Sequence, residues 1–121
     1  MCMLVIKVME CNMSSIDRVN LDLKNSFIRQ NVKNTLGYVV KKRNGYYKDL
    51  KIVDDRRGET IDKFETAGFV HIGQTLNERT FDITKLGDDY YKDIFGKMDY
   101  WQKRLSGLWE RIKADLIDRL T

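Results

Sequence analysis

The chain has 121 residues, of which 42% are hydrophobic and 33% are charged, and its formal net charge is +4. This length suits one domain with a single core, and this composition excludes an intrinsically disordered chain. No apolar run reaches the roughly 18 residues needed to cross a bilayer, so we expect one soluble, cytoplasmic domain over residues 1–121.

The two cysteines, Cys2 and Cys11, both lie near the start of the chain. A disulfide between them would close only a short terminal loop, and their spacing does not fit the Cys-x-x-Cys pattern of zinc sites. We therefore expect reduced thiols, no metal and no cofactor. Residues 1–13 are interpreted as a strand or a leader, so that either Met1 or Met13 begins the ordered domain.

A long first helix is expected after this segment. Ser14 or Ser15 can cap its start, and the following residues tolerate helix as far as Leu36, where Gly37 is expected to end it. The apolar residues fall on two stripes offset by one position. This drift indicates either a helix buried on a broad face or a break near Asn20.

Residues 38–53 are compatible with two structures that exclude each other. The pair Asn44-Gly45 accepts the positive φ of a type I′ turn, which predicts a β-hairpin. The alternative is a short helix from Tyr46 to Val53 that begins at Asn44. The local pattern slightly favours the hairpin.

A helix and a hairpin are expected next. The helix spans residues 57 or 58 to 67. Strands at residues 69–73 and 80–84 follow, because apolar side chains alternate in each of them and one face must be buried. Asn77 and Glu78 are predicted at the tip of this hairpin.

The last segment, residues 97–121, predicts an amphipathic helix, since apolar residues recur there at spacings of three and four. Its apolar stripe is too long for a core of this size to cover, so we expect a homodimer. A helix lying on the domain's own core is the alternative. The predicted dimerisation residues are Trp101, Leu105, Leu108, Ile112 and Leu116, with Trp109 beside them.

Positive charge is concentrated between Lys41 and Arg57. This segment holds seven basic and three acidic residues, and seven minus three is +4, the net charge of the whole chain. Such residues release counterions from a phosphate backbone, and the tyrosines among them can stack on bases. The alternative interpretation is a solvated segment that keeps the protein soluble.

Catalytic chemistry is not indicated. His71 is the single histidine, and it falls in a predicted strand without a second metal ligand or a nucleophile nearby. The acidic pairs at 54–55 and 88–89 point apart on a helix or a strand, and turn and helix-start roles explain both. Neither GxGxxG nor GxxxxGK[ST] occurs. We therefore expect no enzymatic activity.

Residues 67–91, AGFVHIGQTLNERTFDITKLGDDYY, resemble the C-terminal half of a winged helix-turn-helix domain. In that family a recognition helix ends in Ala-Gly or Lys-Gly, and a strand, a polar wing tip, a returning strand and another helix follow. Here Gly68 permits the turn from helix to strand, and Thr84 can cap the next helix. The sequence departs from the family's pattern before this segment. The family has two short helices joined by a tight turn there, whereas Asn44-Gly45 in this chain predicts a β-hairpin.

The resemblance implies an α+β, winged-helix-like domain with its core at residues 14–96, a long N-terminal helix, a wing hairpin and a C-terminal amphipathic helix. It also implies a small, non-enzymatic protein that binds double-stranded DNA or acts in transcription regulation. The alternative is a protein-interaction or assembly module that uses the C-terminal helix and binds no nucleic acid.

In this interpretation the recognition helix is roughly residues 56–66, with Arg56, Arg57, Thr60 and Lys63 on its exposed side. Acidic residues at 59, 62 and 65 reduce the positive charge of that side. The candidate nucleic-acid-binding residues are Lys41, Lys42, Arg43, Tyr46, Lys48, Lys51, Arg56, Arg57, Thr60, Lys63 and Arg79.

Overall fold

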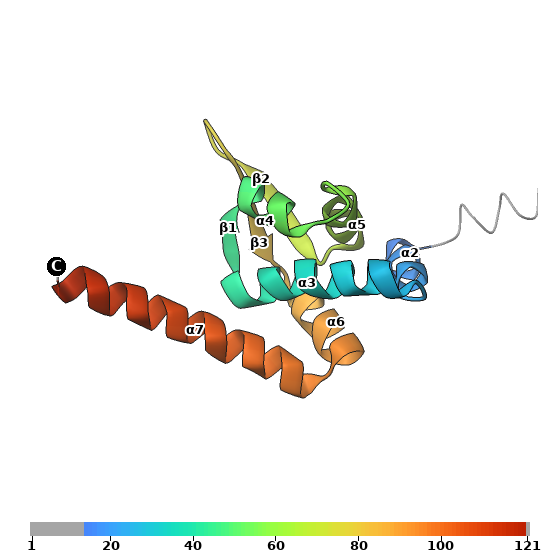
Figure 1. The fold of residues 1–121 in the computed structure, drawn as a ribbon. Coiled ribbons are helices and arrows are strands. Elements are labelled where there is room, and N and C mark those ends of the chain that lie inside the picture. Colours follow the sequence, from blue (N-terminus) through green and yellow to red (C-terminus); the bar gives the residue numbers. More distant parts are fainter. Residues whose placement is uncertain (1–13, 121) are drawn as a thin grey trace, which may run out of the picture.

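The computed structural model of the chain describes residues 14–120. Over these residues the fold consists of six helices and a small three-stranded antiparallel sheet (Figure 1), which confirms the α+β class. The elements, in chain order, are α2 (Ser15–Asp22), α3 (Ser26–Lys42), β1 (Asn44–Tyr46), α4 (Tyr47–Val53), α5 (Glu59–Ala67), β2 (Val70–Gln74), β3 (Arg79–Ile83), α6 (Lys85–Phe95) and α7 (Lys97–Leu120). The strand or leader expected at residues 1–13, with both cysteines, lies outside the described residues.

The expected first helix is two helices. Ser14 caps α2 in a reciprocal capping box with Asp17, and the chain leaves the helix after Asp22. Asn25 then caps α3, because its side-chain oxygen accepts hydrogen bonds from two backbone N–H groups of the first turn. The break therefore lies a few residues later than the position near Asn20 that the stripes suggested.

The predicted stop at Gly37 is wrong, because α3 continues to Lys42. Gly37 lies where α3 meets the C-terminal helices. A side chain there would come within 2.8 Å of the Lys103 Cε atom and 3.4 Å of the Tyr91 hydroxyl oxygen. Gly37 thus leaves room for the ends of these two side chains beside α3.

The hairpin predicted around Asn44-Gly45 is also wrong. The turn is made at Arg43, which ends α3 with a positive φ of 71°. Asn44 and Gly45 are extended in β1, where they lie opposite Asp82 and Phe81 of β3. A side chain at Gly45 would meet the Phe81 ring at 2.9 Å, so this glycine permits close approach to the ring.

The second predicted hairpin is confirmed. Strand β2 pairs with β3 in antiparallel register from Val70 opposite Ile83 to Gln74 opposite Arg79, and Asn77 and Glu78 lie in the connecting tip. The strand order is β1-β3-β2. Figure 1 shows the β2–β3 hairpin projecting away from the helices.

The core lies between α3, α5, α6 and the inner face of the sheet. Phe69, just before β2, packs against Tyr90 of α6 with ring centroids 4.2 Å apart, and its ring also lies 6.0 Å from that of Phe64 in α5. The fully buried large side chains are Val19, Val32, Leu36, Val39, Val40, Leu50, Ile61, Phe64, Phe69, Val70, Phe81 and Tyr91.

The C-terminal helices complete the fold. Thr84 caps α6 as expected, since its hydroxyl oxygen accepts the backbone N–H of Gly87 at 3.0 Å. After Gly96, α7 packs on α3 and α6 and then runs on beyond the domain (Figure 1). It lies on the opposite side of α3 from α4, α5 and the β2–β3 hairpin.

Candidate nucleic-acid interface

The turn before α5 is held by one buried carboxylate. Asp54 is 3% exposed, and its oxygens accept hydrogen bonds from the backbone N–H groups of Gly58, Thr60 and Ile61, each at 3.1 Å. Asn31 of α3 donates its side-chain amide to the same carboxylate at 2.9 Å. A negative charge at the positive end of a helix is stabilising, so Asp54 fixes the start of α5 against α3.

Helix α5 turns an acidic surface outward. Its buried residues include Ile61 and Phe64, whereas Glu59, Asp62 and Glu65 are exposed. Thr60 was expected on the exposed side, and that prediction is wrong. Thr60 is 1% exposed, and its hydroxyl oxygen accepts from Asn31 at 3.1 Å.

Two other cations predicted for this helix are paired within the chain. Lys63 donates to Asp22 of α2 at 2.8 Å. Arg56 precedes the helix and pairs with Asp22 at 3.4 Å and with Glu59 at 2.6 Å. Both cations tie α5 to α2, so they contribute little free positive charge to the outer surface.

The three predicted cations at the end of α3 also have internal partners. Lys41 and Lys42 pair with Glu110 of α7 at 2.8 and 2.9 Å, and hydrogen bonds from these lysines lower the pKa of Glu110 to about 2. Arg43 forms a bidentate ion pair with Asp88 of α6, because its two terminal guanidinium nitrogens donate to the two carboxylate oxygens at 2.6 and 2.7 Å. This pairing raises the pKa of the guanidinium. These cations hold helices together.

The remaining predicted cations gather along one margin of the domain. We call Lys48, Lys51, Arg57 and Arg79, with Tyr46 and Tyr47, the basic edge. All four cations are exposed.

Tyr47 stands at the centre of the basic edge. The Arg79 guanidinium lies 4.0 Å from the centre of the Tyr47 ring. A side chain at Gly58 would meet the Tyr47 hydroxyl at 2.9 Å and the Lys51 Cε at 3.9 Å. Strand β3, α4 and the turn before α5 therefore meet at this tyrosine. Tyr47 was one of the tyrosines expected to stack on bases, but it was not among the candidate binding residues. Its position against Arg79 depends on the fold, because Arg79 lies 32 residues later in β3.

Lys48 and Arg57 differ from the other two cations of the basic edge in their surroundings. The Lys48 Nζ atom is 3.5 Å from the Glu78 Oε1 atom in the hairpin tip and 5.4 Å from the centre of the Tyr46 ring. Arg57 has a φ of 59°, in the left-handed region that non-glycine residues rarely adopt, and this costs on the order of 1 kcal/mol. The turn thus holds the Arg57 side chain outward at an energetic cost.

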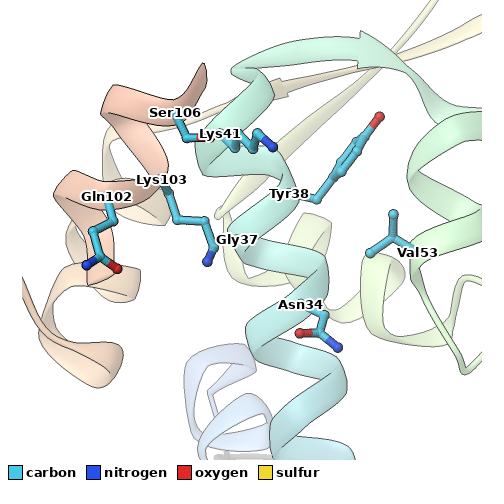
Figure 2. A pocket seen from close by; sticks show the side chains of 8 residues that line it. All are labelled: Asn34, Gly37, Tyr38, Lys41, Val53, Gln102, Lys103 and Ser106. Carbon is cyan, nitrogen blue, oxygen red and sulfur yellow. The ribbon is translucent and has the colours of Figure 1, made fainter. Parts of the chain in front are cut away.

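A groove lies beside the contact between α3 and α7 and reaches Val53 of α4. It has a volume of about 400 Å³, and polar side chains of both helices line it, as Figure 2 shows. Its two cations already have partners, since Lys41 pairs with Glu110 and Lys103 pairs with Asp99 at 3.4 Å. The groove thus belongs to a polar contact between the two helices.

The predicted dimerisation residues lie together on the other side of α7. Trp101, Leu105, Leu108, Ile112 and Leu116 are all at least 42% exposed, and so is the neighbouring Trp109. Because the helix turns this stripe away from α3, the domain's own core does not cover it.

Within residues 14–120, no three His, Cys, Asp or Glu side chains come together as a metal site would require. None of the helices described is both long and apolar enough to span a membrane. Comparisons of the chain with protein-family models, with curated proteins and with solved structures each gave no match.

Proposed function

We propose that this chain is a winged-helix module that contacts double-stranded DNA through its basic edge. The order α3, β1, α4, α5, β2, β3 supports the proposal. Two short helices, α4 and α5, occupy the region where the family has its positioning and recognition helices, and the β2–β3 hairpin corresponds to the wing.

The proposal rests on the exposed cations of α4, β3 and the turn before α5, of which Arg79 and Lys51 lie close to Tyr47. Phosphate contacts from Lys and Arg supply most of the affinity in sequence-independent binding. Lys48 and Lys51 lie on α4, Arg57 in the turn before α5 and Arg79 on β3, and all four are exposed. Arg79 lies over the Tyr47 ring, and Lys51 and the Tyr47 hydroxyl both lie beside Gly58.

The acidic outer surface of α5 argues against tight insertion of this helix into the major groove. Glu59, Asp62 and Glu65 would face phosphates on either side of that groove. The proposed contact is therefore made along the backbone, with Arg79 of the wing reaching the phosphates or the adjacent minor groove. We expect weak sequence preference and a steep dependence on salt.

The test is the affinity for a mixed-sequence duplex, measured by fluorescence anisotropy over a range of salt concentrations. Each lost phosphate contact changes the slope of log K against log salt by about 0.9. Lys48→Ala with Lys51→Ala should therefore flatten the slope by up to about 1.8, and adding Arg57→Ala and Arg79→Ala by up to about 3.6.

The matched control is Lys41→Ala with Lys42→Ala, which also removes two lysines but takes them from the pair with Glu110. It should change the slope far less than the Lys48 and Lys51 variant. No binding at low salt, or an equal effect of the two double variants, would contradict the proposal.

The second candidate is a protein-interaction module of the same shape that binds no nucleic acid. The acidic surface of α5 and the exposed apolar stripe of α7 favour it. Two results together would favour this candidate over the DNA-binding module. They are self-association or partner binding through α7, and no measurable affinity for duplex DNA at low salt.

A further inference from the structure

Helix α7 packs on the domain with its polar side. Lys103, Gly107 and Glu110 lie against α3, and a side chain at Gly107 would come within 2.1 Å of the Lys41 carbonyl oxygen. Tyr100, near the start of the helix, is the aromatic side chain that α7 buries in the core. Amphipathic helices of a globular domain normally bury their apolar stripe. Here the arrangement is reversed, and the apolar stripe faces away from the domain.

This outer stripe is large. Its members are at least 42% exposed and are Met98, Trp101, Leu105, Leu108, Trp109, Ile112, Leu116 and Leu120. At about 100 Å² of exposed apolar area each, they amount to on the order of 800 Å². A stable protein interface buries about 800 Å² per partner, so the stripe alone is large enough for one.

The end of α7 is exposed on all sides. Every residue from 111 to 120 is exposed, and this part of the helix projects past α3 (Figure 1). The last turns of a helix fray most readily. A surface that packs along this segment would stabilise it.

The stripe is close to a palindrome about the bond between Leu108 and Trp109. Reading outward from that point, Leu105 mirrors Ile112 and Trp101 mirrors Leu116. A twofold interface needs a patch that is complementary to itself when turned round, and a palindromic stripe has that property when two helices run antiparallel.

We propose that a second copy of this chain covers the outer face of α7, with the two α7 helices antiparallel about a twofold axis near Leu108 and Trp109. In this arrangement Leu105 of each copy lies near Ile112 of the other, and Trp101 lies near Leu116. The pairing does not involve the basic edge, so it is independent of the proposed DNA contact.

Sedimentation of the full chain at micromolar concentration tests the pairing. The wild type should have twice the mass of one chain, and Leu108→Asp with Ile112→Asp should have the mass of one chain. Ser106→Asp with Lys113→Gln changes the net charge by the same amount on α7 outside the stripe and should stay dimeric. Far-ultraviolet circular dichroism shows whether each variant remains folded.

Cross-linking tests the orientation, in a chain whose Cys2 and Cys11 are replaced by Ser. A short thiol cross-linker should join a Leu105→Cys chain to an Ile112→Cys chain when the two are mixed, and should join neither efficiently to itself. A parallel pair would give the opposite result, because each position would then face its own copy.

A monomeric wild type, a dimer that persists in the Leu108 and Ile112 variant, or self-linking at Leu105 would each overturn the inference. A dimer that fails to bind duplex DNA would instead contradict the proposed function and leave the pairing intact. Binding of DNA by a monomer would do the reverse.

Discussion

Helices α5 and α7 are both amphipathic, but they face the domain in opposite ways. Helix α5 buries Ile61 and Phe64 in the core and turns Glu59, Asp62 and Glu65 to solvent. Helix α7 presents Lys103, Gly107 and Glu110 to α3 and turns its tryptophans and leucines outward. The same periodic pattern in a sequence thus describes an element of the core in one place and an exposed apolar face in the other.

The difference also lies in what holds each helix. Helix α5 is held by apolar packing and by the buried Asp54. Helix α7 is held on α3 by close approach at Gly107 and by ion pairs that are partly exposed, and such pairs contribute little to stability. We therefore expect substitutions in the contacts of α5 to cost more than substitutions in the contacts between α7 and α3.

The largest effect should come from Phe64→Ala. Removing a buried aromatic ring leaves a cavity and should lower the free energy of unfolding by about 3–5 kcal/mol. The matched control is Phe27→Ala, because Phe27 is 89% exposed on α3, and it should change stability by less than about 0.5 kcal/mol. Urea denaturation measures both, and equal losses would place the core elsewhere.

An intermediate effect is expected from Gly107→Ala. The added methyl group would meet the Lys41 carbonyl oxygen, so α7 must move away from α3. The loss should be about 1–3 kcal/mol from overpacking, although alanine is the better helix former.

Hydrogen exchange of the α7 amides should quicken in the Gly107 variant. The control, Ser106→Ala, changes the exposed neighbouring position and should leave the exchange unchanged. If both variants behave alike, the polar side of α7 is not its docking side.

The smallest effect should come from Glu110→Gln, and it should depend on pH. The pKa of Glu110 is lowered from its ordinary 4.5 to about 2 by Lys41 and Lys42. Its carboxylate therefore stabilises the folded chain above about pH 4.5, and this contribution is lost as the pH falls toward 2.

We expect the wild type to exceed this variant in stability by less than about 1 kcal/mol at pH 7, since the pairs are partly exposed. The difference should disappear near pH 2. Glu65→Gln, which removes one exposed carboxylate from α5, should leave the urea midpoint unchanged at both pH values. A difference for Glu110→Gln that stays constant with pH would show that the ion pairs contribute no stability.

The sequence predicted the elements whose signals are local. The alternation in β2 and β3, the cap at Thr84 and the helix end at Gly68 depend on residues a few positions apart, and all are present in the fold. Gly37 and Gly45 misled the prediction, because each glycine there serves a close contact with a distant segment. A glycine has the same local signature in a turn and at a contact.

The candidate interface was less predictable, for a similar reason. The positive excess between Lys41 and Arg57 is real in the sequence, but the acidic partners of Lys41, Lys42 and Arg43 lie more than 40 residues away in α6 and α7. Only the fold separates these cations from Lys48, Lys51 and Arg57. The apolar stripe of α7, by contrast, could be predicted from the sequence, because apolar residues at spacings of three and four are enough to define it.

The two faces of α7 are made of different residues, and this affects how the protein can evolve. The residues that fix α7 to α3, among them Gly107 and Glu110, do not belong to the outer stripe. Substitutions at Leu105 or Ile112 can therefore change the surface on which another protein would pack without disturbing the fold. The outer face of α7 can thus diverge among descendants of this chain while the domain stays the same.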